Sequence, residues 1–79
     1  MQVNQIGPNK TIITFNTGDA IGFSYKTPVV ARIGNDTFRT ERSYSVTTSK
    51  HCGQLLSHLG GNFVGEKPQS FFDELGERV

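Results

Sequence analysis

The chain has 79 residues, 34% of them hydrophobic, with one cysteine, no tryptophan and a formal net charge of +1. This length supports one domain. A lone cysteine excludes an intrachain disulfide and favours a reducing compartment. The near-neutral charge excludes a protein that binds nucleic acid through a large overall positive charge. Because no apolar run approaches a membrane span and the first residues do not form a secretory signal, we expect a cytoplasmic protein with no membrane partner.

Residues before Thr47 are typical of β-structure, since they are rich in Thr, Val, Ile, Phe and Tyr and are interrupted by Gly and Asn. Three strands are predicted first, over residues 2–6, 11–16 and 21–26, with turns at Gly7-Pro8-Asn9 and Thr17-Gly18-Asp19. In the third strand, alternation places Ile21, Phe23 and Tyr25 on one face. This pattern predicts a sheet with one buried and one more hydrated face.

The next segment begins with a proline. Pro28 cannot donate a backbone hydrogen bond, so we expect an edge position, a bulge or a bend there. Two further strands are predicted, over residues 29–33 and from Thr37 to about Ser45, joined by a turn at Gly34-Asn35-Asp36. We expect Phe38 and Tyr44 of the last strand to face the core.

From Thr47 onward the pattern becomes helical. Three candidate N-caps, Thr47, Thr48 and Ser49, precede an apolar stripe at i, i+3, i+4 and i+7, formed by Cys52, Leu55, Leu56 and Leu59. Gly60-Gly61 is expected to end this helix. Residues 62–67 are expected to form a loop, and a short helix is predicted to begin at Pro68 or Ser70 and to end at Gly76.

These elements predict a single α+β domain over residues 1–79, with a β-sheet part (1–46) and a helical part (47–79). The expected fold is an antiparallel three- to four-stranded sheet followed by one amphipathic helix and a short C-terminal helix. The predicted core joins the helix stripe to six sheet residues: Ile13, Phe15, Ile21, Phe23, Phe38 and Tyr44. Ile12, Val30 and one of Phe71 and Phe72 have no obvious place in this core, so we expect them at a self-association surface such as a homodimer interface.

Charge is distributed unevenly along the chain. Residues 26–50 carry five basic and two acidic groups, whereas residues 51–79 carry two basic and four acidic groups. Basic residues on strands can contact a protein partner or neutralise the phosphates of a nucleic acid. The candidate binding face comprises Lys26, Arg32, Arg39, Glu41 and Arg42. The alternative is a solvated outer face with no binding role. The alternation of side chains along the last strand favours this alternative, because Phe38 shares a face with Arg42 but not with Arg39 and no continuous stripe of aromatic and basic residues forms.

A second candidate site lies at the predicted start of the first helix. Thr47, Thr48, Ser49 and Lys50 combine hydroxyl groups, free backbone N–H groups and a lysine, which are the ingredients of an anion site. The segment lacks the glycines of a phosphate-binding loop, and helix capping alone also explains the hydroxyl groups.

Metal and catalytic chemistry are not predicted. His51 and His58 are two helical turns apart, about 10 Å along the axis, which is too far to share one ion. Cys52 lies on the apolar stripe, and no carboxylates are paired in an apolar setting. Because a domain of this size also has little room for a substrate pocket, we expect neither an enzyme nor a cofactor.

The chain resembles a family of small uncharacterised bacteriophage proteins in two segments, Phe23-Ser24-Tyr25-Lys26-Thr27-Pro28-Val29-Val30-Ala31 and Ser45-Val46-Thr47-Thr48-Ser49-Lys50-His51. The shared pattern is an aromatic-Ser-Tyr-x-Thr-x-Val strand, then a second strand that runs into Thr-Thr-x-Lys-His at a helix start. The resemblance spans residues 20–59 and implies no established activity and no catalytic residues. It implies synthesis in the cytoplasm of an infected bacterium.

A small protein of this kind is expected to act by occupying a surface of a larger partner. The principal hypothesis is a stoichiometric binder of a host protein, such as an inhibitor of a host defence factor. The first alternative is a nucleic-acid accessory protein that uses Lys26, Arg32, Arg39, Arg42 and Lys50. The second alternative is a structural protein that forms a homo-oligomer.

Overall fold

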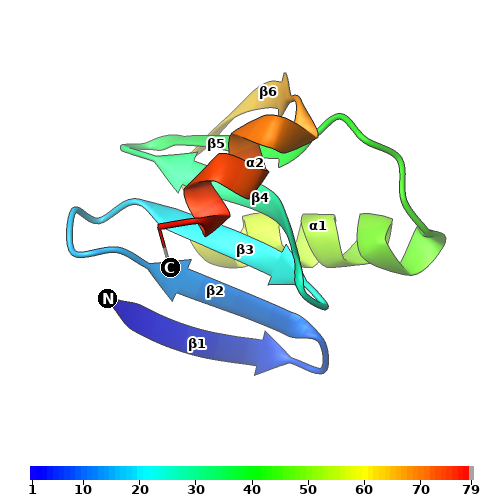
Figure 1. Cartoon of the computed structure of the whole chain (residues 1–79), viewed down its shortest axis with the longest axis horizontal. Helices are drawn as coiled ribbons and strands as arrows, with labels where there is room; N and C mark the ends of the chain where they lie inside the picture. Colours follow the sequence, from blue (N-terminus) through cyan, green and yellow to red (C-terminus); the bar gives the residue numbers. More distant parts are fainter. Residues whose placement is uncertain (79) are drawn as a thin grey trace.

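The computed structural model describes residues 1–78 as a six-stranded mixed sheet with two helices (Figure 1). The strands lie in the sheet in chain order, from β1 at one edge to β6 at the other. The elements are β1 (Gln2–Gly7), β2 (Lys10–Thr14), β3 (Ala20–Ser24), β4 (Thr27–Ile33), β5 (Asp36–Thr40), α1 (Val46–Leu59), β6 (Asn62–Lys67) and α2 (Gln69–Gly76). The α+β class is therefore as predicted, but the sheet has more strands than expected.

Strands β1 to β5 form an antiparallel meander with short turns. The turn after β2 contains Gly18 with φ 95°, and the turn after β4 contains Gly34 with φ 62°, so glycine is used where the backbone enters the left-handed region. The expected irregularity at Pro28 is a bulge. Gly22 pairs with Val30 whereas the next residue, Phe23, pairs with Pro28, which leaves one extra residue in β4.

The sixth strand corrects the prediction of a loop over residues 62–67. Asn62–Lys67 pairs in parallel with β5, and α1 makes the crossover that parallel pairing requires. The strand is anchored at its start, where the Asn62 backbone N–H donates to the Asn35 carbonyl oxygen at 2.7 Å. A Cβ atom at Gly61 would lie 2.7 Å from that same oxygen, so only glycine fits beside this contact. The sequence half expected to be helical thus supplies one edge of the sheet.

Both faces of the sheet are buried, each beneath one helix (Figure 1). The core under α1 comprises Ile12, Ala20, Val29, Val30, Cys52, Leu55 and Leu59. The core under α2 comprises Ile13, Ile21, Ala31, Phe72 and Leu75, with Phe15, Phe23 and Phe38 packed against it. The predicted packing of the α1 stripe on Ile13 and Ile21 is therefore wrong, because these residues lie on the opposite face from α1.

The residues expected at a self-association surface have places in these two cores. Ile12 and Val30 are buried under α1, and Phe72 is buried under α2. The second buried face escaped prediction because its β3 residues, Ala20 and Gly22, are small rather than strongly apolar. Their small size lets α1 approach the sheet closely: a Cβ atom at Gly22 would lie 3.3 Å from Cδ2 of Leu55.

The segment between β5 and α1 also differs from the prediction. β5 ends at Thr40 instead of continuing to Ser45, and Tyr44, expected in the core, is 38% exposed. α1 begins at Val46 and is capped by Ser45, whose Oγ accepts from the Thr48 backbone N–H at 3.2 Å. Neither helix within residues 1–78 is long and apolar enough to cross a membrane.

Candidate binding groove

The predicted basic face is divided between the two ends of the sheet. Lys26 lies in the exposed turn before β4, whereas Arg32 lies near the opposite end of that strand. Glu41 and Arg42 are exposed in the segment that follows β5. Arg39 pairs with Val30, so its side chain projects toward the α1 face, and it is only partly exposed. The structure does not bring these five residues together on one open strand face, because helices cover both faces.

Arg32 makes two hydrogen bonds that connect the sheet to α1. Its Nη1 donates to the Leu59 carbonyl oxygen at 2.7 Å, and its Nη2 donates to the Gly18 carbonyl oxygen at 2.9 Å. Leu59 is the last residue of α1, so the guanidinium lies at the negative end of the helix dipole. This position gives Arg32 a structural role in addition to any role in binding.

The predicted anion site at the start of α1 contains one buried and three exposed side chains. Thr47, Ser49 and Lys50 are exposed, whereas Thr48 is buried. The Thr48 Oγ1 accepts a hydrogen bond from Ser24 at 3.4 Å, so this hydroxyl belongs to the interior. Thr48 therefore has a structural role, and only Thr47, Ser49 and Lys50 face solvent.

A buried serine–histidine pair was not predicted. Ser24 Oγ on β3 and His51 Nδ1 on α1 are 2.7 Å apart, and the Tyr25 ring lies 5.6 Å from the imidazole. Burial lowers the pKa of His51 below its ordinary value of 6.5, and the nearby Lys10 charge lowers the pKa further, which favours the neutral imidazole. Ser24 is 1% exposed, so its hydroxyl is closed to substrates. The pair fastens α1 to the sheet.

A surface groove lies between β1, β2 and α1, and we call it the β1–α1 groove. It forms because α1 packs mainly against β3 and β4, which leaves the neighbouring edge of the sheet less covered. It consists of two hollows of about 660 and 160 Å³ that share His58. The larger is lined by Ile6, Lys10, Gly53, Gln54, Ser57 and His58, and the smaller by Gln2, Asn4, Ile12, Thr14, Ala20, Arg32, His58 and Leu59.

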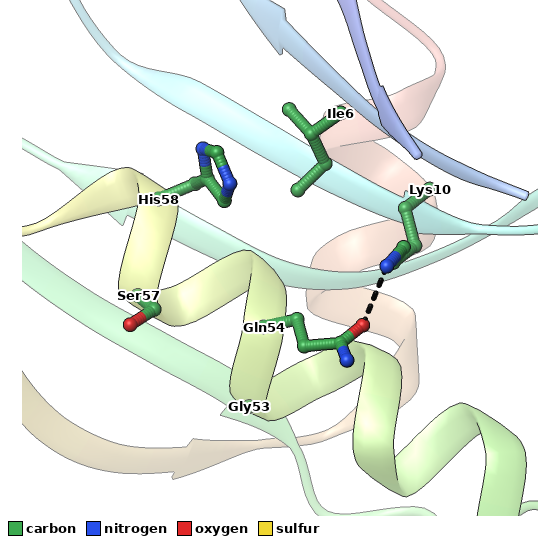
Figure 2. Close-up of a pocket in the computed structure, with 6 residues that line it drawn as sticks. All are labelled: Ile6, Lys10, Gly53, Gln54, Ser57 and His58. Carbon is green, nitrogen blue, oxygen red and sulfur yellow. Dashed lines mark hydrogen bonds between the residues drawn. The ribbon is translucent and has the colours of Figure 1, made fainter. Parts of the chain in front are cut away.

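Lys10 is the best-positioned cation in the groove. Its Nζ donates to Gln54 Oε1 at 2.6 Å, and Figure 2 shows this contact bridging the strands and the helix. The Lys10 stem passes over Gly7, where a Cβ atom would lie 2.8 Å from Cε. Gly7 therefore leaves the space that the lysine stem occupies.

Charge in the groove is one-sided. Lys10 and Arg32 line it, and within residues 1–78 no aspartate or glutamate lines either hollow. Neutral polar groups and the Ile6 side chain complete the surface. The groove can therefore bind a negatively charged group that accepts hydrogen bonds, with a small apolar contact to Ile6 beside it.

Gly53 lies in the middle of α1 and lines the larger hollow (Figure 2). A glycine inside a helix costs about 1 kcal/mol relative to alanine. No packing contact requires it, because a Cβ atom there would meet nothing within 4 Å. The missing side chain widens the groove at a cost to helix stability.

The fold defines a class: a small α+β protein whose mixed sheet carries one helix on each face. Within that class, the chain belongs to the family described as "Family of unknown function (DUF8033)", whose model matches residues 1–74. The match includes every residue that lines the β1–α1 groove. No curated protein and no solved structure matches the chain.

Proposed function

We propose that this chain is a protein-binding module that acts stoichiometrically, by adding a strand of its partner to the free edge of β1. The observation that carries the proposal is the contrast between faces and edges of the sheet. Helices cover both faces, whereas β1 is an outer strand whose residues Gln2–Gln5 are exposed. A protein with this architecture offers its edge for regular backbone hydrogen bonding with another chain.

The composition of β1 supports this choice of edge. Soluble proteins commonly protect outer strands with charged residues or proline, and Gln2–Gly7 contains neither. The opposite edge, β6, contains Glu66 and Lys67, and its Gly65 has φ 152°, which departs from regular strand geometry. The pairing of β1 with β2 is irregular only between Gln5 and Gly7, so Gln2–Gln5 is a regular and uncharged stretch of outer strand. This stretch is the less protected of the two edges.

The proposed biological setting is infection of a bacterium by a phage. It rests on the resemblance of residues 20–59 to bacteriophage proteins, together with the single buried cysteine, which suits a reducing cytoplasm. In that setting the chain occupies a surface of a host protein, such as a defence factor, and blocks it without a chemical step.

The nucleic-acid alternative receives less support from the arrangement of the basic residues. A single-strand binder needs cations and exposed aromatic rings along one track. Lys26 and Arg32 lie at different ends of β4, and Arg32 is engaged with α1. A homo-oligomer formed through two β1 edges is the other alternative, and both are outcomes of the test.

The test compares two matched edge variants in a pull-down from bacterial lysate, with and without nuclease. Val3→Lys places a charge on β1, and Val64→Lys places the same charge on β6, at residues that are 64% and 54% exposed. We expect a nuclease-resistant protein that the wild type and Val64→Lys retain in fixed stoichiometry and that Val3→Lys loses.

Three results would count against the proposal. Equal capture by both variants would exclude the β1 edge. Capture that disappears with nuclease would favour nucleic acid, and recovery of the bait alone as a large assembly would favour the structural homo-oligomer.

A further inference from the structure

The β1–α1 groove runs beside the strand edge that we propose for partner binding. Asn4 and Ile6 of β1 both line it. Asn4 pairs with Ile12, which is buried under α1, and Ile6 packs against that same core, so both side chains lie on the α1 side of the sheet. A strand added to β1 would likewise direct every second side chain toward α1. The groove therefore lies where it can contact the side chains of such a strand.

The charges of the groove select among these side chains. Lys10 approaches it from β2 and Arg32 from β4. Lys10 gives one hydrogen bond to Gln54, and a lysine ammonium has further donors to offer. Because the described lining contains no carboxylate, an acidic side chain finds partners there and a basic one does not.

Gly53 supplies an independent argument for an occupant. It weakens α1 locally, and no neighbouring atom within 4 Å requires the absence of a Cβ atom. Gly53 is exposed and lines the larger hollow from α1, beside Gln54 (Figure 2). A glycine with no role in the packing of the free protein fits a role in admitting a ligand.

We infer that the β1–α1 groove binds an extended acidic segment of a protein partner, with glutamate or aspartate side chains directed at Lys10 and the space over Gly53. The inference rests on the proposed function, because it takes the partner strand at β1 as given. It adds the chemistry of the partner: a strand in which acidic residues alternate with apolar ones.

The direct test uses a synthetic peptide of about eight residues, a typical strand length, in which Glu and Val alternate. Fluorescence anisotropy measures its binding to the full chain, with a Lys–Val peptide and a single-stranded oligonucleotide as competitors. We expect the Glu–Val peptide to bind, with an affinity that falls as salt rises, and neither competitor to displace it.

Matched variants assign the binding to the groove. Lys10→Met should lower the affinity for the Glu–Val peptide by about tenfold. Lys50→Met makes the same change at an exposed α1 lysine that does not line the groove, and it should leave the affinity unchanged. Gly53→Gln should weaken binding while raising the melting temperature, since glutamine favours the helix. A merely structural role for Gly53 would not separate these two effects.

The outcomes distinguish failure of the groove from failure of the proposed function. If the Glu–Val peptide does not bind, or Lys50→Met weakens it as much as Lys10→Met, the inference is wrong. If the oligonucleotide displaces the peptide, the groove recognises phosphate instead. The Val3→Lys comparison with the captured lysate protein is independent of these variants, so the edge proposal stands or falls separately.

Discussion

The crowding of Gly22 by Val30 of the neighbouring strand and by Leu55 of α1 gives a quantitative prediction for the variant Gly22→Ala. The added Cβ would lie 2.5 Å from Cγ2 of Val30 and 3.3 Å from Cδ2 of Leu55. Val30 and Leu55 are both fully buried, and a valine side chain has little rotameric freedom to move aside. Overpacking of this kind costs about 1–3 kcal/mol, so the free energy of unfolding should fall by that amount.

A double-mutant cycle tests the physical cause. Val30→Ala alone removes two buried methyl groups and should cost about 1.5–3 kcal/mol. It also removes the atom that the new Cβ meets, so Gly22→Ala should cost at least about 1 kcal/mol less in the Val30→Ala background than in the wild type.

Urea unfolding followed by far-UV circular dichroism is a suitable assay, because the chain has no tryptophan. The reasoning would be refuted if the two changes were additive within about 0.5 kcal/mol, the range expected for independent sites. Additivity would mean that the added Cβ atom at Gly22 does not contact the Val30 side chain of the neighbouring strand.

Three further predictions follow from the buried groups. Phe72→Ala should lower the free energy of unfolding by about 3–5 kcal/mol, because Phe72 is fully buried under α2; a loss below about 1 kcal/mol in urea unfolding would mean that α2 does not cover this face. Because the pKa of His51 is lowered in the fold, the unfolded chain binds more protons, so stability should decline as the pH falls below 6.5; thermal unfolding should show this, and His51→Asn should flatten the decline. Burial raises the pKa of the Cys52 thiol, so a thiol reagent should react slowly with the native protein and rapidly in urea, and equal rates would contradict the buried position.

The fold was predictable wherever the sequence pattern is local. The meander, its turns and the irregularity at Pro28 follow from alternation and from turn residues. The second buried face was not predictable in this way, because Ala20 and Gly22 mark it by their small size and only the approach of α1 makes that size meaningful. β6 was missed for a related reason: Phe63 and Val64 are more than half exposed, so the strand carries no buried apolar face.

The candidate groove could be predicted only in part. Gly53 interrupts a predicted helix, and this signal was available from the sequence alone. Lys10 was not assignable to a site, because its partner Gln54 is 44 residues away and is brought near by the packing of α1 on the sheet. The residues of the predicted basic face do not lie on one open face of the sheet. The alternation of side chains along a strand does not indicate which face of the sheet a helix covers.

The order in which the two helices occur along the chain has a consequence for synthesis. The five strands of the meander leave the ribosome before either helix, with apolar side chains on both faces and no helix to cover either. α1 shields one face, but Ile13, Ile21 and Ala31 stay uncovered until Phe72 and Leu75 have emerged.

Folding of this domain during translation therefore cannot be completed before α2 has emerged. A product shortened before α2 would retain the half of the core under α1 and expose the other half to water. Such a product would be a target for chaperones and proteases, because α2 is needed to complete the second core.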